Sequence, residues 1–191
     1  GVADEALKNA AVGNRRLVVV VDHNGGSIAE SHGGRYRHLA AWRQSNGTAA
    51  NNLFRALGFD YRYVDQGNDI ATMIAAFQAV RDIDHPLVLH VHTQKGRGFA
   101  PALADEEAWH WHTPFTLPDG APKRPATGAN YYDIILATLG QQLAAGTPVY
   151  ALNAAVPGGF HLKDWAAASP ERYIHLGIAV QESITLAAGL A

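Results

Sequence analysis

Residues 17–21 read LVVVV, and residues 87–92 read LVLHVH. Apolar, β-branched runs of this kind are typical of strands covered on both faces, as in a parallel sheet. The segment FDYRYV at 59–64 alternates in polarity like a further strand. Helical patterns precede and separate these strands. The order helix, strand, helix, strand, helix, strand therefore predicts an α/β fold built on a parallel sheet.

The first predicted helices are bounded by residues that end helices. Residues 3–12 are alanine-rich, and Gly13-Asn14 follows them as a stop signal. Residues 38–57 contain one or two helices around Asn46-Gly47, and Gly58 is expected to act as their C-cap. The polar, glycine-rich stretch 22–34 is expected to be the loop at the carboxyl end of the first strand.

A third helix is predicted from a cap followed by an apolar stripe. Asn68 or Asp69 is the cap, and the stripe consists of Ile70, Met73, Ile74, Phe77 and Val80. Residues 94–129 show no sustained period, as expected of a functional segment or a domain linker. Beyond them we expect a helix with Ile135, Leu139 and Leu143 on one face, a strand at 149–152, a turn at 157–159, a short helix at 162–168, a strand at 173–176 and a final helix.

Composition narrows the function classes. The 191 residues are 48% hydrophobic and 17% charged, with a net charge of −2, as in a globular chain with one domain and part of another. The basic residues are scattered, so we expect no nucleic-acid partner. No apolar run is long enough for a membrane span, and no membrane partner is expected. The absence of cysteine excludes disulfides and thiolate sites and fits a reducing, cytoplasmic compartment.

Four blocks carry a family resemblance: VDHNGGSI at 21–28; NLFRALGFDY at 52–61 with GND at 67–69; HTQKGRGFAPA at 92–102 with WHWHTPF at 109–115; and NAAVPGG at 153–159 with GIAVQES at 177–183. In this order and spacing they resemble the 1-deoxy-D-xylulose-5-phosphate synthases of the transketolase superfamily. The chain opens without Met and ends inside a helical pattern, so we expect an internal fragment.

The resemblance implies a thiamine-diphosphate-binding fold in which residues 1–110 close the diphosphate-binding domain, 111–129 form a linker and 130–191 begin the pyrimidine-binding domain. It implies a transferase that decarboxylates pyruvate and joins the two-carbon unit to glyceraldehyde 3-phosphate, for the biosynthesis of isoprenoid precursors, thiamine and pyridoxal. Thiamine diphosphate and Mg²⁺ are the implied cofactors. A homodimer is implied because the cofactor of this superfamily lies between domains, often across a subunit boundary.

The resemblance also assigns residues to the cofactor. Asn24 and the backbone carbonyl of Gly26 are the implied metal ligands, of the oxygen type that Mg²⁺ prefers. Lys95 and His110 are implied contacts, with His110 also implied as a catalytic residue, and Ser27, Ile178 and Glu182 complete the set. The residues alone leave other interpretations open, because Asn24-Gly25 is also a turn dipeptide and Lys95 is also a plausible solvated loop charge. A Lys after a parallel strand nevertheless lies where open α/β sheets bind ligands.

One position departs from the family. In Gly-Ile-Ala-Glu, the family's Glu hydrogen-bonds the aminopyrimidine and promotes proton removal from the thiazolium; here that position is Val180, which can neither ionise nor donate. Losing such a proton relay typically costs about 10²–10⁴ in rate. Glu182 is no simple replacement, because helical positions two apart point about 200° away from each other.

Other interpretations stay open. A transketolase-like ketol transfer would keep the cofactor and change the substrates, and Val180 favours a cofactor-binding homologue without turnover. The histidine pairs 90/92 and 110/112 have the spacing that places each pair on one side of a strand, and zinc-dependent hydrolysis is a distant alternative. Buried or linker histidines are expected instead, and Trp109 and Trp111 are predicted to pack under the linker.

Overall fold

The computed structural model describes residues 2–13, 15–124, 128 and 130–191. The Asn14 part of the predicted helix stop, and linker positions 125–127 and 129, lie outside this range. The chain divides into two compact units: unit 1 holds residues 1–25 and 32–97, and unit 2 holds residues 26–31 and 98–191. These units do not test the predicted domain boundaries at 110 and 130, which stay predictions.

Unit 1 is built on a parallel sheet of β1 (Leu17–His23), β3 (Pro86–His92) and β2 (Asp60–Val64), in the order β1-β3-β2. Its helices are α1 (Val2–Val12), α2 (Gly34–Gln44), α3 (Leu53–Ala56) and α4 (Ile70–Ala79). The parallel register pairs Val21 with His90 and His23 with His92. The predicted α/β class and its parallel sheet are confirmed.

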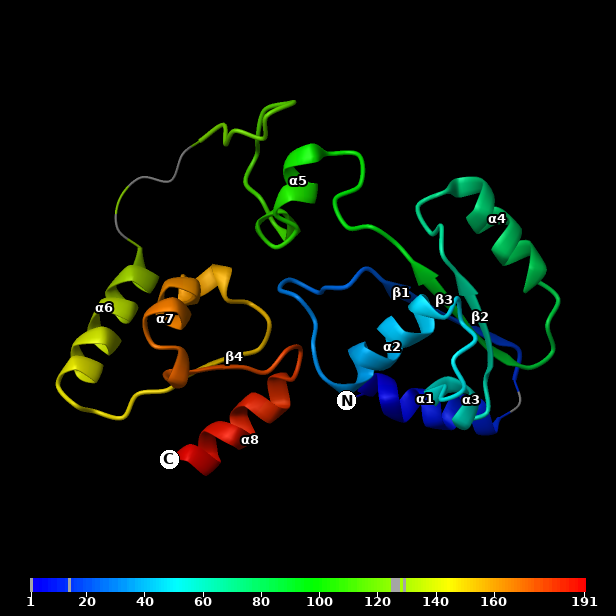
Figure 1. Ribbon diagram of the computed structural model, residues 1–191, viewed down its shortest axis with the longest axis horizontal. Coiled ribbons are helices and arrows are strands. Elements are labelled where there is room, and N and C mark those ends of the chain that lie inside the picture. Colours follow the sequence, from blue (N-terminus) through cyan, green and yellow to red (C-terminus); the bar gives the residue numbers. More distant parts are fainter. Residues whose placement is uncertain (1, 14, 125–127, 129) are drawn as a thin grey trace. The chain divides into compact units, whose positions relative to one another are not determined.

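Two apolar clusters cover the two faces of this sheet. Helices α1, α2 and α3 lie on one face and α4 on the other (Figure 1). Trp42, Phe54 and Tyr61 lead the first cluster, whereas Val80, Leu87 and Leu89 lead the second. The central strand β3 supplies both clusters in alternation, which explains its continuous apolar run. Because both faces of β3 are covered, this strand is a rigid support for the residues at its carboxyl end.

The helix ends follow the predicted signals. Asp69 caps α4 by accepting a hydrogen bond of 2.7 Å from the backbone N–H of Thr72. Gly58 has φ +98°, a left-handed conformation that favours glycine at the end of a helix. One helix begins earlier than predicted, because α2 starts at Gly34 rather than near residue 38. The apolar stripe of α4 is only partly buried, and Ile70, Ile74 and Phe77 are exposed.

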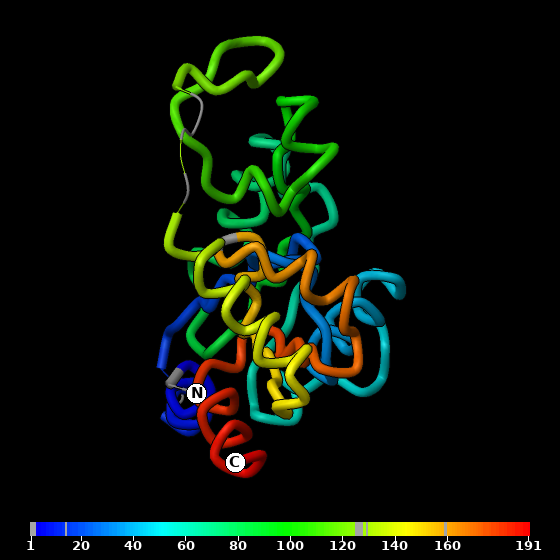
Figure 2. Tube along the Cα trace, turned by 90° about the vertical axis from the view of Figure 1, so that its left-hand side faces the viewer, coloured from blue at the N-terminus to red at the C-terminus, as the bar shows by residue number. Residues whose placement is uncertain are grey.

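Unit 2 contains a two-stranded parallel sheet of β4 (Ala151–Asn153) and β5 (Tyr173–His175). Its helical segments are α5 (Ala100–Ala104), η1 (Ala108–His110), α6 (Tyr131–Ala144), η2 (Gly158–Phe160), α7 (Leu162–Ala168), η3 (Pro170–Arg172) and α8 (Val180–Leu190). The strand expected at 149–152 is shifted to 151–153. Figures 1 and 2 show α6 beside α7. Tyr132 of α6 packs edge-on against Phe160 of η2 at 4.7 Å between ring centroids.

The linker prediction was partly wrong. Trp109 packs as expected against Phe99, Phe115 and the ring of His112. Trp111 is 77% exposed, so it does not pack under the linker. His110 ends the 3-10 helix η1, and the one-sided strand spacing predicted for His110 and His112 is therefore absent. His110 lies in a 3-10 turn and His112 lies beyond it, so strand alternation does not relate the two side chains.

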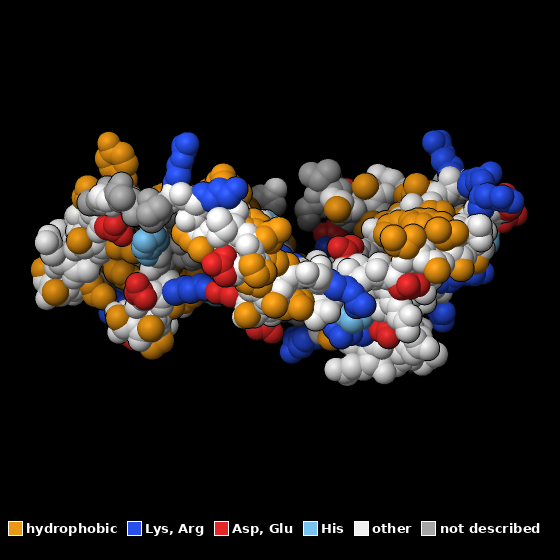
Figure 3. All heavy atoms as spheres, turned by 90° about the horizontal axis from the view of Figure 1, so that it is seen from above, with side chains coloured by type: hydrophobic (Ala, Val, Ile, Leu, Met, Phe, Trp, Pro, Cys, Tyr) orange, Lys and Arg blue, Asp and Glu red, His pale blue; other side chains and the backbone are white. Residues whose placement is uncertain are grey.

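None of the described helices is long and apolar enough to cross a membrane. On the face drawn in Figure 3, basic side chains are scattered among acidic and apolar ones.

Candidate cofactor site at the carboxyl ends of β1 and β3

The loops after β1 and β3 begin at the same edge of the sheet, because the two strands are parallel neighbours. The backbone N–H of Thr93 donates to the carbonyl of His23 at 3.2 Å, which holds the two strand ends together. Asn24 is the first residue after β1, and Lys95 is the third residue after β3. The topology thus brings the predicted metal ligand and the predicted phosphate contact to one edge, where open α/β sheets bind ligands.

The residues at this edge suit a magnesium-bridged diphosphate. Asn24 and Lys95 are both half-buried, and they supply an amide oxygen and an ammonium group. Gly25 has φ +83°, and a Cβ at this position would meet no atom within 4 Å, so its backbone is open to approach. Among the described residues no group of three or more His, Cys, Asp or Glu side chains is placed to hold a metal. The fit therefore rests on amide and carbonyl oxygens.

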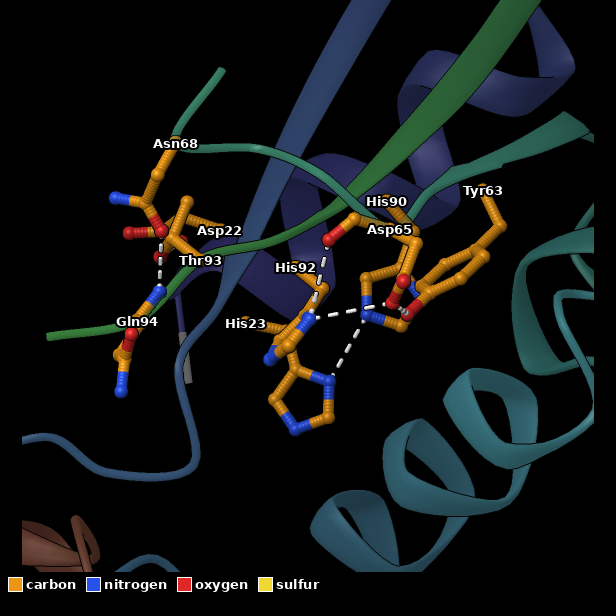
Figure 4. Close-up of polar contacts among 9 residues, drawn as sticks. All are labelled: Asp22, His23, Tyr63, Asp65, Asn68, His90, His92, Thr93 and Gln94. Atoms are coloured by element: carbon orange, nitrogen blue, oxygen red, sulfur yellow. Dashed lines mark hydrogen bonds and ion pairs between the residues drawn. The ribbon is translucent and has the colours of Figure 1, made fainter. Parts of the chain in front are cut away.

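Polar side chains from all three strands lie beside this edge (Figure 4). His92 Nδ1 lies 3.1 Å from the carbonyl of Asp65 and 3.3 Å from its carboxylate Oδ1. The hydroxyl of Tyr63 donates to the same Oδ1 at 2.8 Å. Both of the His92 contacts are acceptors, so Nδ1 of His92 must carry a proton. This carboxylate–imidazole pair fixes the orientation of the His92 ring.

The loop between β2 and α4 is fastened to the end of β3. Asn68 accepts a hydrogen bond of 2.6 Å from the backbone N–H of Gln94, and the N–H of Gly67 donates to the carbonyl of His92 at 2.8 Å. Gly67 has no room for a side chain, since a Cβ there would lie 2.5 Å from that carbonyl. The residue Lys95 therefore follows a backbone that is held from two sides.

A buried chain of ring side chains lies behind the edge. Tyr61 Oη is 2.6 Å from Nδ1 of His90, and Nε2 of His90 is 3.0 Å from Nδ1 of His23. His90 is 0% exposed and His23 is 7% exposed. Burial, reinforced by the charges of His23 and His92, lowers the pKa of His90 to about 4. His90 is therefore a neutral core residue, as expected for a buried histidine.

The other predicted site residues lie in unit 2. Gly26 and Ser27 belong to the short segment 26–31, in which the N–H of Ser27 donates to the carbonyl of Ala29 at 3.1 Å. His110 is exposed at the end of η1. Ile178 is exposed just before α8, and Glu182 is exposed in its first turn. The assignments of these residues to the cofactor stay predictions.

Val180 is the first residue of α8 and is 59% exposed. Its carbonyl accepts a hydrogen bond of 2.6 Å from Oγ of Ser183. Because α8 runs from Val180 to Leu190, Glu182 points about 200° away from Val180 around the helix. The side chain at the position where the resemblance predicts a Glu is therefore apolar and exposed, and the helix geometry does not offer Glu182 in its place.

Known proteins are similar to this chain in sequence. The family model described as 1-deoxy-D-xylulose-5-phosphate synthase matches residues 43–93. The 1-deoxy-D-xylulose-5-phosphate synthase of Acinetobacter baumannii is 32% identical over 220 aligned positions that cover 100% of this chain and 34% of the relative. Over its whole length this chain is similar to the 1-deoxy-D-xylulose-5-phosphate synthases.

Further synthases agree. That of Listeria monocytogenes is 31% identical over 100% of this chain and 33% of the relative. A synthase of Geobacter sulfurreducens is 39% identical over 73% of this chain and 22% of the relative. The chain spans about a third of the length of the Acinetobacter and Listeria synthases. The residues matched by the family model include α3, β2, α4 and β3, and therefore much of the framework behind the candidate edge.

The sequence did not reveal the Tyr61–His90–His23 chain. It depends on the register of three strands, whereas the sequence pattern describes each strand by itself. The signal that could have revealed it is the spacing of two residues within each strand. This spacing separates Tyr61 from Tyr63 on β2 and His90 from His92 on β3, near the strand ends. A parallel sheet places such residues on one face.

Proposed function

We propose that the protein carrying this chain is a thiamine-diphosphate-dependent transferase of the 1-deoxy-D-xylulose-5-phosphate synthase type. It would decarboxylate pyruvate and join the two-carbon unit to glyceraldehyde 3-phosphate, in the biosynthesis of isoprenoid precursors, thiamine and pyridoxal. The supporting observation is the position of Asn24 and Lys95 at the carboxyl ends of adjacent strands, in a chain that aligns over its whole length with these synthases.

This chain would hold the diphosphate end of the cofactor. The Asn24 amide oxygen and the Gly26 carbonyl would ligate Mg²⁺, and Lys95 would contact a phosphate oxygen. When bound, thiamine diphosphate would supply a nucleophilic carbon and an electron sink for the decarboxylation. Ser27, His110, Ile178 and Glu182 would complete the contacts. The protein would act as a homodimer in the cytoplasm.

A second candidate is a homologue that binds the cofactor without turnover. The exposed Val180 at the start of α8 favours it, because the family's proton relay is absent from that position. The expected loss is about 10²–10⁴ in rate. Cofactor binding, which depends mainly on the diphosphate end, would survive this change.

One experiment separates these functions. The protein carrying this chain is titrated with thiamine diphosphate and Mg²⁺, and carbon dioxide release from pyruvate is measured with and without glyceraldehyde 3-phosphate. Release by the unaltered protein supports the transferase. The inert homologue is supported if the unaltered protein binds the cofactor but releases no carbon dioxide. In that case Val180→Glu should restore the release, and the matched change Ile184→Glu on the same helix should not. A protein that binds no thiamine diphosphate contradicts both.

A further inference from the structure

The buried chain of Tyr61, His90 and His23 has a direction. Tyr61 is buried, and among the described residues its hydroxyl has one hydrogen-bond partner, Nδ1 of His90 at 2.6 Å. A buried hydroxyl whose proton lacks an acceptor is costly. Burial raises the pKa of Tyr61 to about 12, so the hydroxyl keeps its proton at neutral pH. Tyr61 must therefore donate, and Nδ1 of His90 must accept.

The tautomer of His90 then follows. A neutral imidazole that accepts at Nδ1 carries its proton at Nε2. Nε2 of His90 lies 3.0 Å from Nδ1 of His23, so it donates there. The reverse direction would require Nδ1 of His90 to donate to Tyr61, which would leave the buried hydroxyl proton without a partner. Only one arrangement of the protons therefore satisfies the hydrogen bonds among Tyr61, His90 and His23.

His23 is the last link. Because its Nδ1 accepts from His90, the proton of the neutral ring is on Nε2. This second nitrogen lies on the side of the ring that faces away from His90 (Figure 4). His23 is also the last residue of β1 and directly precedes Asn24. His23 thus lies, with a defined tautomer, at the strand end where the diphosphate is proposed to bind.

His23 is paired with His92 in the register of β1 and β3. His92, its partner across the strand pair, is the other tautomer. Its Nδ1 carries the proton and donates to Asp65, so in a neutral ring its Nε2 is an acceptor. Of these two paired rings, only His23 in neutral form offers a donor through Nε2.

We propose that His23 donates its Nε2–H to an oxygen of the bound diphosphate, and that Tyr61 and His90 are positioning residues that fix its tautomer. This inference rests on the proposed function for the identity of the ligand, but the tautomer does not depend on it. The contact adds a neutral donor to the Asn24 and Lys95 contacts. A hydrogen bond to a charged acceptor of this kind is among the stronger ones in proteins.

The tautomer is measured first, by ¹H–¹⁵N NMR of the ring nitrogens at neutral pH without ligand. The expected result is a protonated Nε2 and an unprotonated Nδ1 for His23. Tyr61→Phe should convert this single form into a mixture of tautomers, whereas Tyr63→Phe should leave it unchanged, because the hydroxyl of Tyr63 donates to Asp65 instead. A His23 ring protonated at Nδ1 in the unaltered protein would overturn the inference.

The ligand is tested by adding thiamine diphosphate with Mg²⁺ to the same sample. The Nε2 proton of His23 should shift and become slower to exchange. His23→Leu should weaken binding by about 10- to 100-fold, while His23→Gln, which keeps an N–H near that position, should recover much of it. His85→Gln, at the opposite end of β3, is the matched control. Tight binding that leaves the His23 resonance unmoved would overturn the contact.

The proposed function and the inference about His23 can be refuted independently. If the unaltered protein binds no thiamine diphosphate, the proposed function and the phosphate contact are refuted, but the tautomer of His23 is still read from the ligand-free spectrum. If the cofactor binds and the tautomer is wrong, the proposed function stands and the inference about His23 is refuted.

Discussion

The hydroxyl of Tyr61 and Nδ1 of His90 lie 2.6 Å apart, and both side chains are buried between the sheet and the helices α1 to α3. A polar pair of this kind inside an apolar cluster is stable only while both groups satisfy each other. Trp42 packs edge-on against His90 at 6.5 Å between ring centroids and helps to exclude water. The stability of unit 1 should therefore depend on this pair in two measurable ways.

The first is a dependence of stability on pH. Burial lowers the pKa of His90 to about 4, whereas an unfolded histidine titrates near 6.5. The unfolded chain therefore binds more protons in this range, and the free energy of unfolding should fall as pH drops from about 6.5 to about 4, then level off. At about 1.4 kcal/mol per pKa unit, the loss amounts to a few kcal/mol. Denaturant titrations at several pH values measure it; a His90→Asn variant with the same pH slope would contradict the prediction.

The second is the cost of removing the hydroxyl. Tyr61→Phe should lower the free energy of unfolding by about 1–3 kcal/mol, because Nδ1 of His90 loses its buried donor. Tyr63→Phe is the matched control: its hydroxyl bonds to the exposed carboxylate of Asp65, so the change should be smaller. Thermal unfolding of the three proteins compares them. Equal losses for both variants would show that burial of the Tyr61 pair has no special role.

The sequence predicted the three strands of unit 1 because each is an apolar or alternating run bounded by polar loops. It also predicted a cap at Asn68 or Asp69, of which Asp69 is the one observed, and the helix end at Gly58. It did not predict the exposure of Trp111 or the 3-10 geometry at His110, because irregular segments follow tertiary contacts rather than a period. The hydrogen bonds that join Tyr61, His90 and His23 connect residues far apart in sequence. Predicting them would have required the register of the strands.

A third prediction concerns Gly67, in the loop that fastens β2 to the end of β3. A Cβ at this position would collide with the side chain of Val91 and lie 2.5 Å from the carbonyl of His92. Gly67→Ala should destabilise the protein by about 1–3 kcal/mol, as overpacking does. Gly140→Ala is the opposite case: this glycine lies inside α6 with open space around it, so alanine should stabilise by about 0.5–1 kcal/mol. Melting temperatures that move in the same direction would contradict this account.

A fourth prediction concerns Lys95. Lys95→Ala should raise the dissociation constant of thiamine diphosphate by about 10- to 100-fold, since a charge-assisted contact of about 1.5–3 kcal/mol is removed. The fold should be unaffected, because the residue lies in the loop after β3. Lys8→Ala on α1 serves as the control for a lost surface charge. Isothermal titration measures both, and an unaltered constant for Lys95→Ala would identify it as a solvated loop charge.

The central claim is that the loop after β1 carries a magnesium-bridged diphosphate on Asn24. The most direct measurement is the affinity for thiamine diphosphate, with and without Mg²⁺, of the unaltered protein, Asn24→Ala and the exposed control Asn9→Ala. We predict that Mg²⁺ strengthens binding in the unaltered protein and in Asn9→Ala, and that Asn24→Ala loses most of this gain while its thermal stability is nearly unchanged. Equal magnesium-dependent binding by all three proteins would contradict the claim.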